Sequence, residues 1–94
     1  MKLLLSEKKE LEVREHEICL EYYIIVDEFE GVNKAQMESY GVCIKRGTEE
    51  ASFHGITFSG KNIEWLMERL TINSVTPTTL PYVIDDLLDD YFLY

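Results

Sequence analysis

Apolar and polar residues alternate along much of the first sixty positions, a pattern typical of half-buried β-strands. The alternation is clearest over residues 17–26. One face of that strand would carry Ile18, Leu20, Tyr22, Ile24 and Val26. β-branched and aromatic side chains of this kind suit a pleated surface. The opposite face, with Cys19, Glu21, Tyr23 and Ile25, becomes apolar toward its end, so it can be partly covered.

Three further strands follow from the same pattern. The odd-numbered apolar residues from Leu3 to Val13 predict an extended stretch, interrupted around residues 7–10 and followed by a turn at 14–17. Residues 27–36 are polar and predict a connection. Strands are predicted over 38–46 and 50–58, with Gly47 in the turn between them. Because the apolar phase changes at His54-Gly55, we expect a β-bulge there that returns the apolar residues to one face.

The last third of the chain changes to a helical period. Ser59 predicts a helix N-cap and Asn73 a left-handed C-cap. Between them an i, i+3, i+4, i+7 stripe is formed by Ile63, Leu66, Met67 and Leu70. A second helix is predicted with Pro81 in its first turn, where a missing N–H costs nothing. Its apolar stripe comprises Leu80, Val83, Ile84, Leu87, Leu88 and Tyr91.

Strands followed by helices, without βαβ alternation, predict an α+β fold. We expect one domain over residues 1–94: an antiparallel meander of three to five strands, followed by two C-terminal helices packed on one face. A chain of 94 residues is long enough for one modest core.

Charge narrows the classes of partner. The chain has 18 acidic and 9 basic residues, a formal net charge of −9. Such a field repels phosphates, so direct binding to nucleic acid and to anionic membranes is disfavoured, and a partner with a basic surface is favoured. No apolar run approaches the ~20 residues of a membrane span, and the N-terminus does not resemble a signal peptide. With only two cysteines, Cys19 and Cys43, we expect a cytoplasmic protein with reduced thiols.

Two segments resemble a family of small clostridial-type bacterial proteins, a domain of unknown function of about this length. They are the strand Tyr40-Gly41-Val42-Cys43-Ile44 and the tail from Val75-Thr76-Pro77 to Val83-Ile84-Asp85-Asp86. The family pattern is Tyr-Gly-Ile-x-Ile and Val-Thr-Pro-x-x-Leu-x-Asp-Val-Ile-x-Asp; this chain has Val42 for the first isoleucine and Tyr82 for an aspartate. The resemblance implies a bacterial, cytoplasmic, single-domain protein and implies no activity.

The most conspicuous cluster of charge is on the second predicted helix. Asp85, Asp86, Asp89 and Asp90 form two i, i+4 pairs along one side. They are a solvated face, a docking face for a basic partner or a weak divalent-cation site, and the last is disfavoured because calcium sites usually come from loops that this helix lacks. Asp89 and Asp90 lie toward the helix end, where the dipole disfavours negative charge, and this hints at selection for something other than helix stability.

The C-terminus is unusually aromatic. Tyr91, Phe92 and Tyr94 either complete the core or dock into a second copy or another partner, since aromatic residues are enriched at interfaces. We therefore take the four aspartates and these three aromatic residues as the candidate interaction surface, and a homo-oligomer stays open.

No catalytic spacing is found. His16 and His54 have no cysteine or histidine at metal-ligand spacing, and no phosphate-binding loop or nucleophile motif is present. We therefore expect no cofactor, no metal and no enzymatic activity. The sequence favours a protein-interaction or regulatory module. Two alternatives are an acidic decoy for a nucleic-acid-binding partner, and a metabolite-binding protein or small enzyme.

Overall fold

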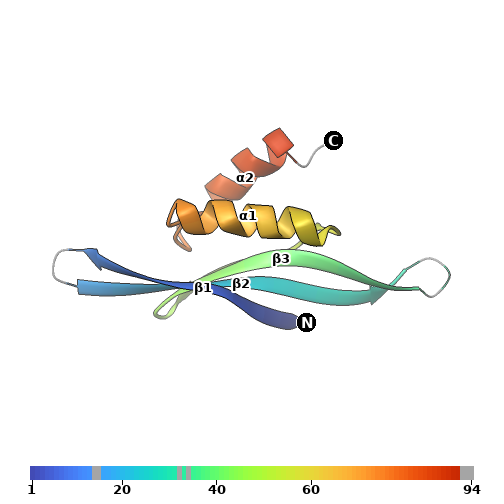
Figure 1. Cartoon of the computed structure of the whole chain (residues 1–94), viewed down its shortest axis with the longest axis horizontal. Helices are drawn as coiled ribbons and strands as arrows, with labels where there is room; N and C mark the ends of the chain where they lie inside the picture. Colours follow the sequence, from blue (N-terminus) through green and yellow to red (C-terminus); the bar gives the residue numbers. More distant parts are fainter. Residues whose placement is uncertain (14–15, 32, 34, 92–94) are drawn as a thin grey trace.

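The protein is a four-stranded antiparallel sheet followed by two helices, which confirms the predicted α+β class and meander (Figure 1). The computed structural model describes residues 1–13, 16–31, 33 and 35–91, and side chains except those of 11–13, 16–18 and 88–91. The strands are β1 (Lys2–Val13), β2 (His16–Glu30), β3 (Gln36–Arg46) and β4 (Glu49–Thr57), paired in chain order. The helices are α1 (Gly60–Ile72) and α2 (Leu80–Tyr91), and both lie on the same face of the sheet (Figure 1).

The core lies between the sheet and the helices and uses the predicted apolar stripes. The sheet contributes the even-numbered residues Leu20, Tyr22, Val42 and Ile44, and the helices contribute Ile63, Leu66, Met67, Leu70, Leu80 and Ile84. Burial of each large aliphatic side chain stabilises the fold by about 2 kcal/mol. The one polar atom that Tyr22 brings into the core is satisfied, because its hydroxyl donates to the Val75 carbonyl at 3.0 Å. Burial, with the nearby charge of Glu7, raises the pKa of Tyr22 to about 12.

The helix ends confirm one predicted cap and correct another. Ser59 is the N-cap of α1, and its Oγ accepts from the Asn62 N–H at 3.3 Å. Asn73 is the C-cap but is not left-handed, with φ −88°; the left-handed residue is Ser74, with φ 50°. The reason is that Asn73 caps α1 through its side chain, whose Nδ2 donates to the Arg69 carbonyl at 2.8 Å.

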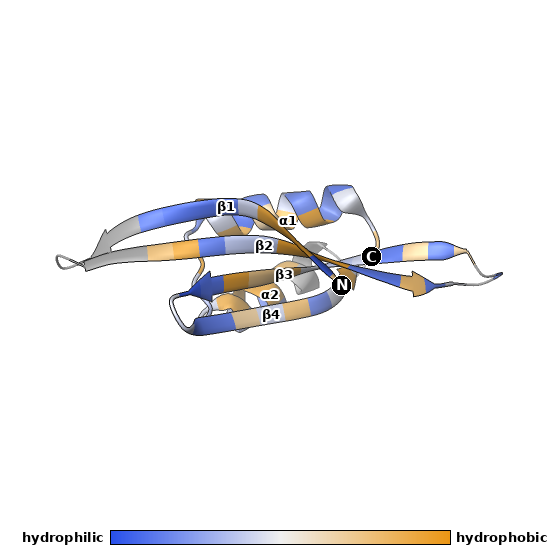
Figure 2. Cartoon of the chain, turned by 90° about the horizontal axis from the view of Figure 1, so that it is seen from below, coloured by the Kyte–Doolittle hydropathy of each residue, from blue (hydrophilic) through white to orange (hydrophobic). Residues whose placement is uncertain are grey.

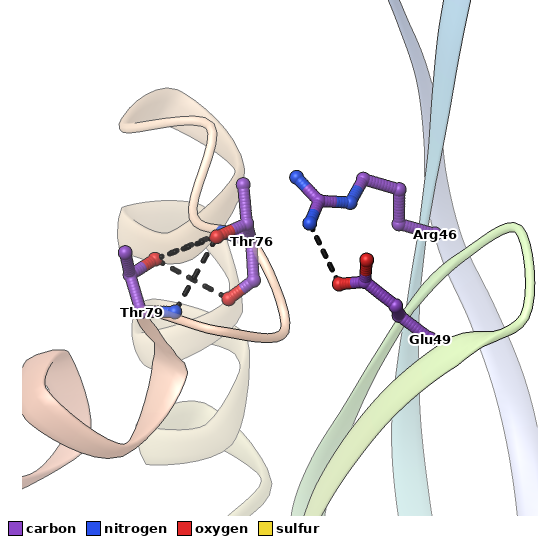
Figure 3. Close-up of polar contacts among 4 residues, drawn as sticks. All are labelled: Arg46, Glu49, Thr76 and Thr79. Carbon is purple, nitrogen blue, oxygen red and sulfur yellow. Dashed lines mark hydrogen bonds and ion pairs between the residues drawn. The ribbon is translucent and has the colours of Figure 1, made fainter.

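The start of α2 is held by a reciprocal pair of threonines (Figure 3). The Thr76 N–H donates to Thr79 Oγ1 at 3.1 Å, and the Thr79 N–H donates to Thr76 Oγ1 at 3.4 Å. This is a capping-box arrangement that satisfies two backbone donors before the helix begins. Pro81 falls in the first turn of α2, as predicted. The β3–β4 turn, closed by the Arg46–Glu49 ion pair, lies beside this connection (Figure 3).

Two of the predicted breaks in the strands are wrong. β1 runs through residues 7–10 without interruption and instead has a bulge between Leu5 and Glu7. β2 begins at His16, inside the predicted turn, and continues to Glu30, where a connection was predicted. The residues there belong to a strand because each has a cross-strand partner in β3, as in the polar pair Asp27–Ser39 and the apolar pair Phe29–Met37.

The bulge predicted in β4 is confirmed. The register with β3 shifts after the Val42–Phe53 pair, and Gly55 takes φ 61°. Phe53 and Ile56 both pack against the core despite their opposite parity, as expected of a bulge. Phe58 does not return to that face. It follows the last β4 residue, Thr57, is 69% exposed, and packs its ring against Phe29 at a centroid distance of 5.8 Å.

Candidate interaction surface

The face of the sheet turned away from the helices, here called the open face, is covered by no other element of the described chain (Figure 2). Strand alternation puts the odd-numbered residues of β2 and β3 on it, because the even-numbered ones point into the core. Across the strands, Lys8, Glu21, Lys45 and Glu50 are successive register partners. This charged row alternates in sign, so neighbouring side chains attract one another, each pair by at most about 1 kcal/mol.

The next row of the open face is held by hydrogen bonds to two of these glutamates. The Tyr23 hydroxyl donates to Glu21 Oε2 at 2.5 Å, which raises the pKa of that tyrosine, and Lys45 lies 5.2 Å from the centre of the Tyr23 ring. Cys43, directly opposite Tyr23, is 1% exposed and its Sγ contacts Glu50 Oε1 at 3.5 Å. Burial and the Glu50 carboxylate raise the pKa of Cys43 to about 11. At neutral pH this thiol is therefore protonated and a poor nucleophile.

The two cysteines are free and too far apart to form a disulfide. Cys43 is in register with Tyr23, and Cys19 lies four residues before Tyr23 on the same strand. Four residues of β-strand span roughly 13 Å, whereas a disulfide needs Cα atoms within about 7 Å. Cys19 is exposed. The geometry therefore opposes an intramolecular redox pair.

His54 reaches the open face through the β4 bulge. Its Nδ1 lies 2.7 Å from Asp27 Oδ2, so the side chain bridges β4 and β2 across the intervening strand β3. The β3 residue beneath the bulge is Gly41, and a Cβ there would overlap the Phe53 carbonyl oxygen and press on the His54 Cα. Glycine is therefore required for the backbone of β4 to approach this closely.

The described chain gathers no metal site around this histidine. No group of three His, Cys, Asp or Glu side chains with metal-binding geometry occurs among the described residues. Within the same residues, no helix is long and apolar enough to cross a membrane.

The predicted acidic surface is described only in part. Asp85 and Asp86 are exposed on α2, and neither makes an ion pair with a described residue. The backbone of Asp89, Asp90 and Tyr91 continues α2, but their side chains, together with Phe92 and Tyr94, lie outside the described residues.

The most exposed apolar run of the described chain was missed by the sequence interpretation. Leu3, Leu4 and Leu5 are 39%, 52% and 52% exposed, and all three lie on β1, an edge strand of the sheet. At this end β1 is the part of the sheet farthest from both helices (Figure 1). Three consecutive exposed apolar residues are unfavourable unless they have a function. The sequence shows that Leu3-Leu4-Leu5 breaks the alternation of a half-buried strand, but it does not show that this strand lies at an edge.

A second exposed apolar cluster lies at the far end of the β2–β3 hairpin. Phe29 and Met37 are cross-strand partners, and Phe58 packs against Phe29. These residues were missed because the sequence there was read as a polar connection. They are 37%, 40% and 69% exposed for Phe29, Met37 and Phe58, which is comparable with the edge leucines, but unlike the leucines they are not consecutive on one strand.

Comparison with known proteins gives a family and no close relative of known role. No curated protein and no solved structure matches the chain. One family model matches residues 1–90, nearly the whole length of the chain, and it describes a family of unknown function, in agreement with the kind of family the sequence resembles. The chain belongs to this family of unknown function, DUF6514.

Proposed function

We propose that this protein is a non-catalytic protein-interaction module that binds a strand of a protein partner along the N-terminal half of β1. The observation that carries the proposal is the exposed run Leu3–Leu5 on a sheet edge. An edge strand offers a row of backbone N–H and C=O groups that another strand can pair with. Exposed leucines beside those groups add apolar area that a partner would remove from water.

Two features of the open face support the non-catalytic part of the proposal. The thiol of Cys43 is buried and its pKa is about 11, so it is not an activated nucleophile. The carboxylates of Glu21 and Glu50 are engaged by Tyr23 and Cys43. Reactive groups are thus used to hold the sheet together. We also propose a cytoplasmic location, supported by two free cysteines that are placed too far apart to pair.

A second candidate surface is the acidic face of α2. Asp85 and Asp86 are exposed and unpaired within the described residues, and this favours the predicted docking of a basic partner. The acidic decoy and the small-molecule binder remain hypotheses from the sequence alone.

Affinity capture with three matched variants tests which surface is used. Leu4→Lys places a charge on the β1 edge, Asp85→Asn with Asp86→Asn neutralises the described part of the acidic face, and Ser52→Lys places the same charge on the exposed β4 edge. The proposal expects a partner that Leu4→Lys loses and the other two variants retain, with the same result between purified proteins. Loss with the aspartate variant alone would move the function to α2. Equal binding by all three would contradict both surfaces.

A further inference from the structure

We propose that the occupant of the β1 edge is a second copy of this chain, paired antiparallel about Leu4 so that two sheets join into one of eight strands. This inference rests on the proposed function, because it names the partner of the same edge.

The sequence of β1 is self-complementary in only one register. In a twofold antiparallel pair the two strands share an axis at one residue, and residues equally far on either side of it face each other. With the axis at Leu4, Leu4 meets its own copy and Leu3 meets Leu5 of the other copy. An axis at Leu3 sets Leu4 opposite Lys2, and an axis at Leu5 sets Leu3 opposite Glu7. Only the axis at Leu4 pairs every leucine with a leucine.

This register places the apolar residues correctly on both faces of a joined sheet. Leu3 and Leu5 are in register with Ile25 and Tyr23 of the open face, whereas Leu4 is in register with Ile24, which packs against the core. A twofold axis perpendicular to the sheet keeps these faces, so Leu3 and Leu5 would extend the open face while Leu4 meets Leu4 on the helix side. Each of the six leucines would lose part of its exposed area against its cross-strand partner.

Charge and space both favour this edge over β4. Residues 1–10 carry three lysines and two glutamates in a chain of net charge −9, so two copies repel each other least here. β4 begins with Glu49 and Glu50 and is distorted by its bulge, and both features discourage pairing. In Figure 1, strands β2 and β3 lie between the helices and the N-terminal half of β1. A strand that approaches the outer side of β1 therefore meets neither helix.

Sedimentation velocity on the intact chain tests the association. We expect a reversible monomer–dimer equilibrium with a dissociation constant below about 1 mM. Leu4→Lys should weaken it at least tenfold although it lowers the net negative charge, while Ser52→Lys should leave it unchanged. Because both copies are acidic, added salt should strengthen the dimer by screening their repulsion. A basic partner would show the opposite dependence on salt.

Disulfide trapping tests the register. In a background of Cys19→Ser, the variant Leu4→Cys should oxidise to a covalent dimer, since directly opposed residues have Cα atoms about 5 Å apart. Leu3→Cys alone and Leu5→Cys alone should not, because the diagonal separation is about 8 Å, but a mixture of the two should cross-link. Ser52→Cys on the β4 edge is the control for random collision.

The outcomes separate this inference from the proposed function. A strict monomer at every concentration overturns the second copy as the occupant; if Leu4→Lys still loses a captured partner, the binding role of the edge survives. A dimer that is unaffected by Leu4→Lys overturns the β1 interface. Trapping through Leu5→Cys alone overturns the register.

Discussion

β1 and β4 are the two edge strands of the sheet, and within the described chain neither β4 nor the N-terminal half of β1 has a neighbouring strand on its outer side. β4 is protected in the ways common to natural edge strands: two glutamates at its start, a bulge and a histidine drawn across the sheet to Asp27. β1 has charged residues at its start, Lys2, and after its bulge, where Glu7, Lys8 and Lys9 follow. Before the bulge it exposes three leucines. The fold therefore protects the β4 edge, whereas the N-terminal half of β1 keeps exposed apolar residues at an edge of the sheet.

The largest effect should come from the glycine beneath the β4 bulge. In Gly41→Ala the new Cβ would overlap the Phe53 carbonyl oxygen, so the bulge must move and the His54–Asp27 bridge with it. We expect the free energy of unfolding, measured with urea, to fall by about 3 kcal/mol. Gly60→Ala, where a Cβ meets nothing within 4 Å, is the matched control and should change it little. Wild-type stability in Gly41→Ala would contradict the close approach of the Phe53 carbonyl to the backbone of β3.

The second largest effect should come from Cys43 on β3, whose contribution to the free energy of unfolding depends on pH. The pKa of Cys43 rises from 9.0 to about 11 in the folded protein, so the folded state holds this proton more tightly than the unfolded state. The stabilisation is complete below pH 9 and is lost as the pH rises toward 11, by roughly 2 kcal/mol. Cys43→Ala should make the decline in stability between these pH values shallower, leaving the part above pH 10 that comes from Tyr22, whereas Cys19→Ala, at an exposed thiol, should retain the full decline. If the two variants had the same dependence of stability on pH, the burial and hydrogen bonding of the Cys43 thiol would be contradicted.

The bulges of β4 and β1 show how far the sequence could predict the structure. The break in phase at His54-Gly55 revealed the β4 bulge, because apolar residues of opposite parity had to reach the same core. The bulge between Leu5 and Glu7 left no such signal, since the leucines before it are consecutive and the charged residues after it fit either face. Lys9, which has the parity of Leu3 and Leu5, lies on the opposite face and donates to the Thr71 carbonyl of α1 at 2.8 Å.

The helices were predictable and the candidate surface was not. The stripe from Ile63 to Leu70 depends only on local periodicity and was confirmed. Which strand lies at an edge depends on pairing between distant segments, so three leucines in a strand could not be recognised as exposed without the strand order. The extension of β2 to Glu30 has the same cause, because Phe29 is a strand residue only through its partner Met37.

A smaller effect should come from the residue that shapes the bulge itself. Gly55 takes φ 61°, and nothing lies within 4 Å of a Cβ placed there, so Gly55→Ala adds backbone strain without a clash. We expect a loss of about 1 kcal/mol in the free energy of unfolding, well below that of Gly41→Ala. If the two alanine variants were equally destabilised, the close packing at Gly41 would cost no more than the backbone strain at Gly55.

The smallest effect on the stability of the fold should come from Leu4, in the N-terminal half of β1. Leu4 is 52% exposed, so Leu4→Lys should change the unfolding free energy of the monomer by less than about 0.5 kcal/mol. The measurement must be made at a concentration where sedimentation shows only monomer, because a dimer would add stability through mass action. A buried leucine, for comparison Leu66→Ala in α1, should cost about 3 kcal/mol. If Leu4→Lys were destabilised to that extent, the leucines would belong to the monomer's own core, and the contrast between the two edges would fail. A small loss of stability together with a lost partner would mean that these residues serve binding rather than folding.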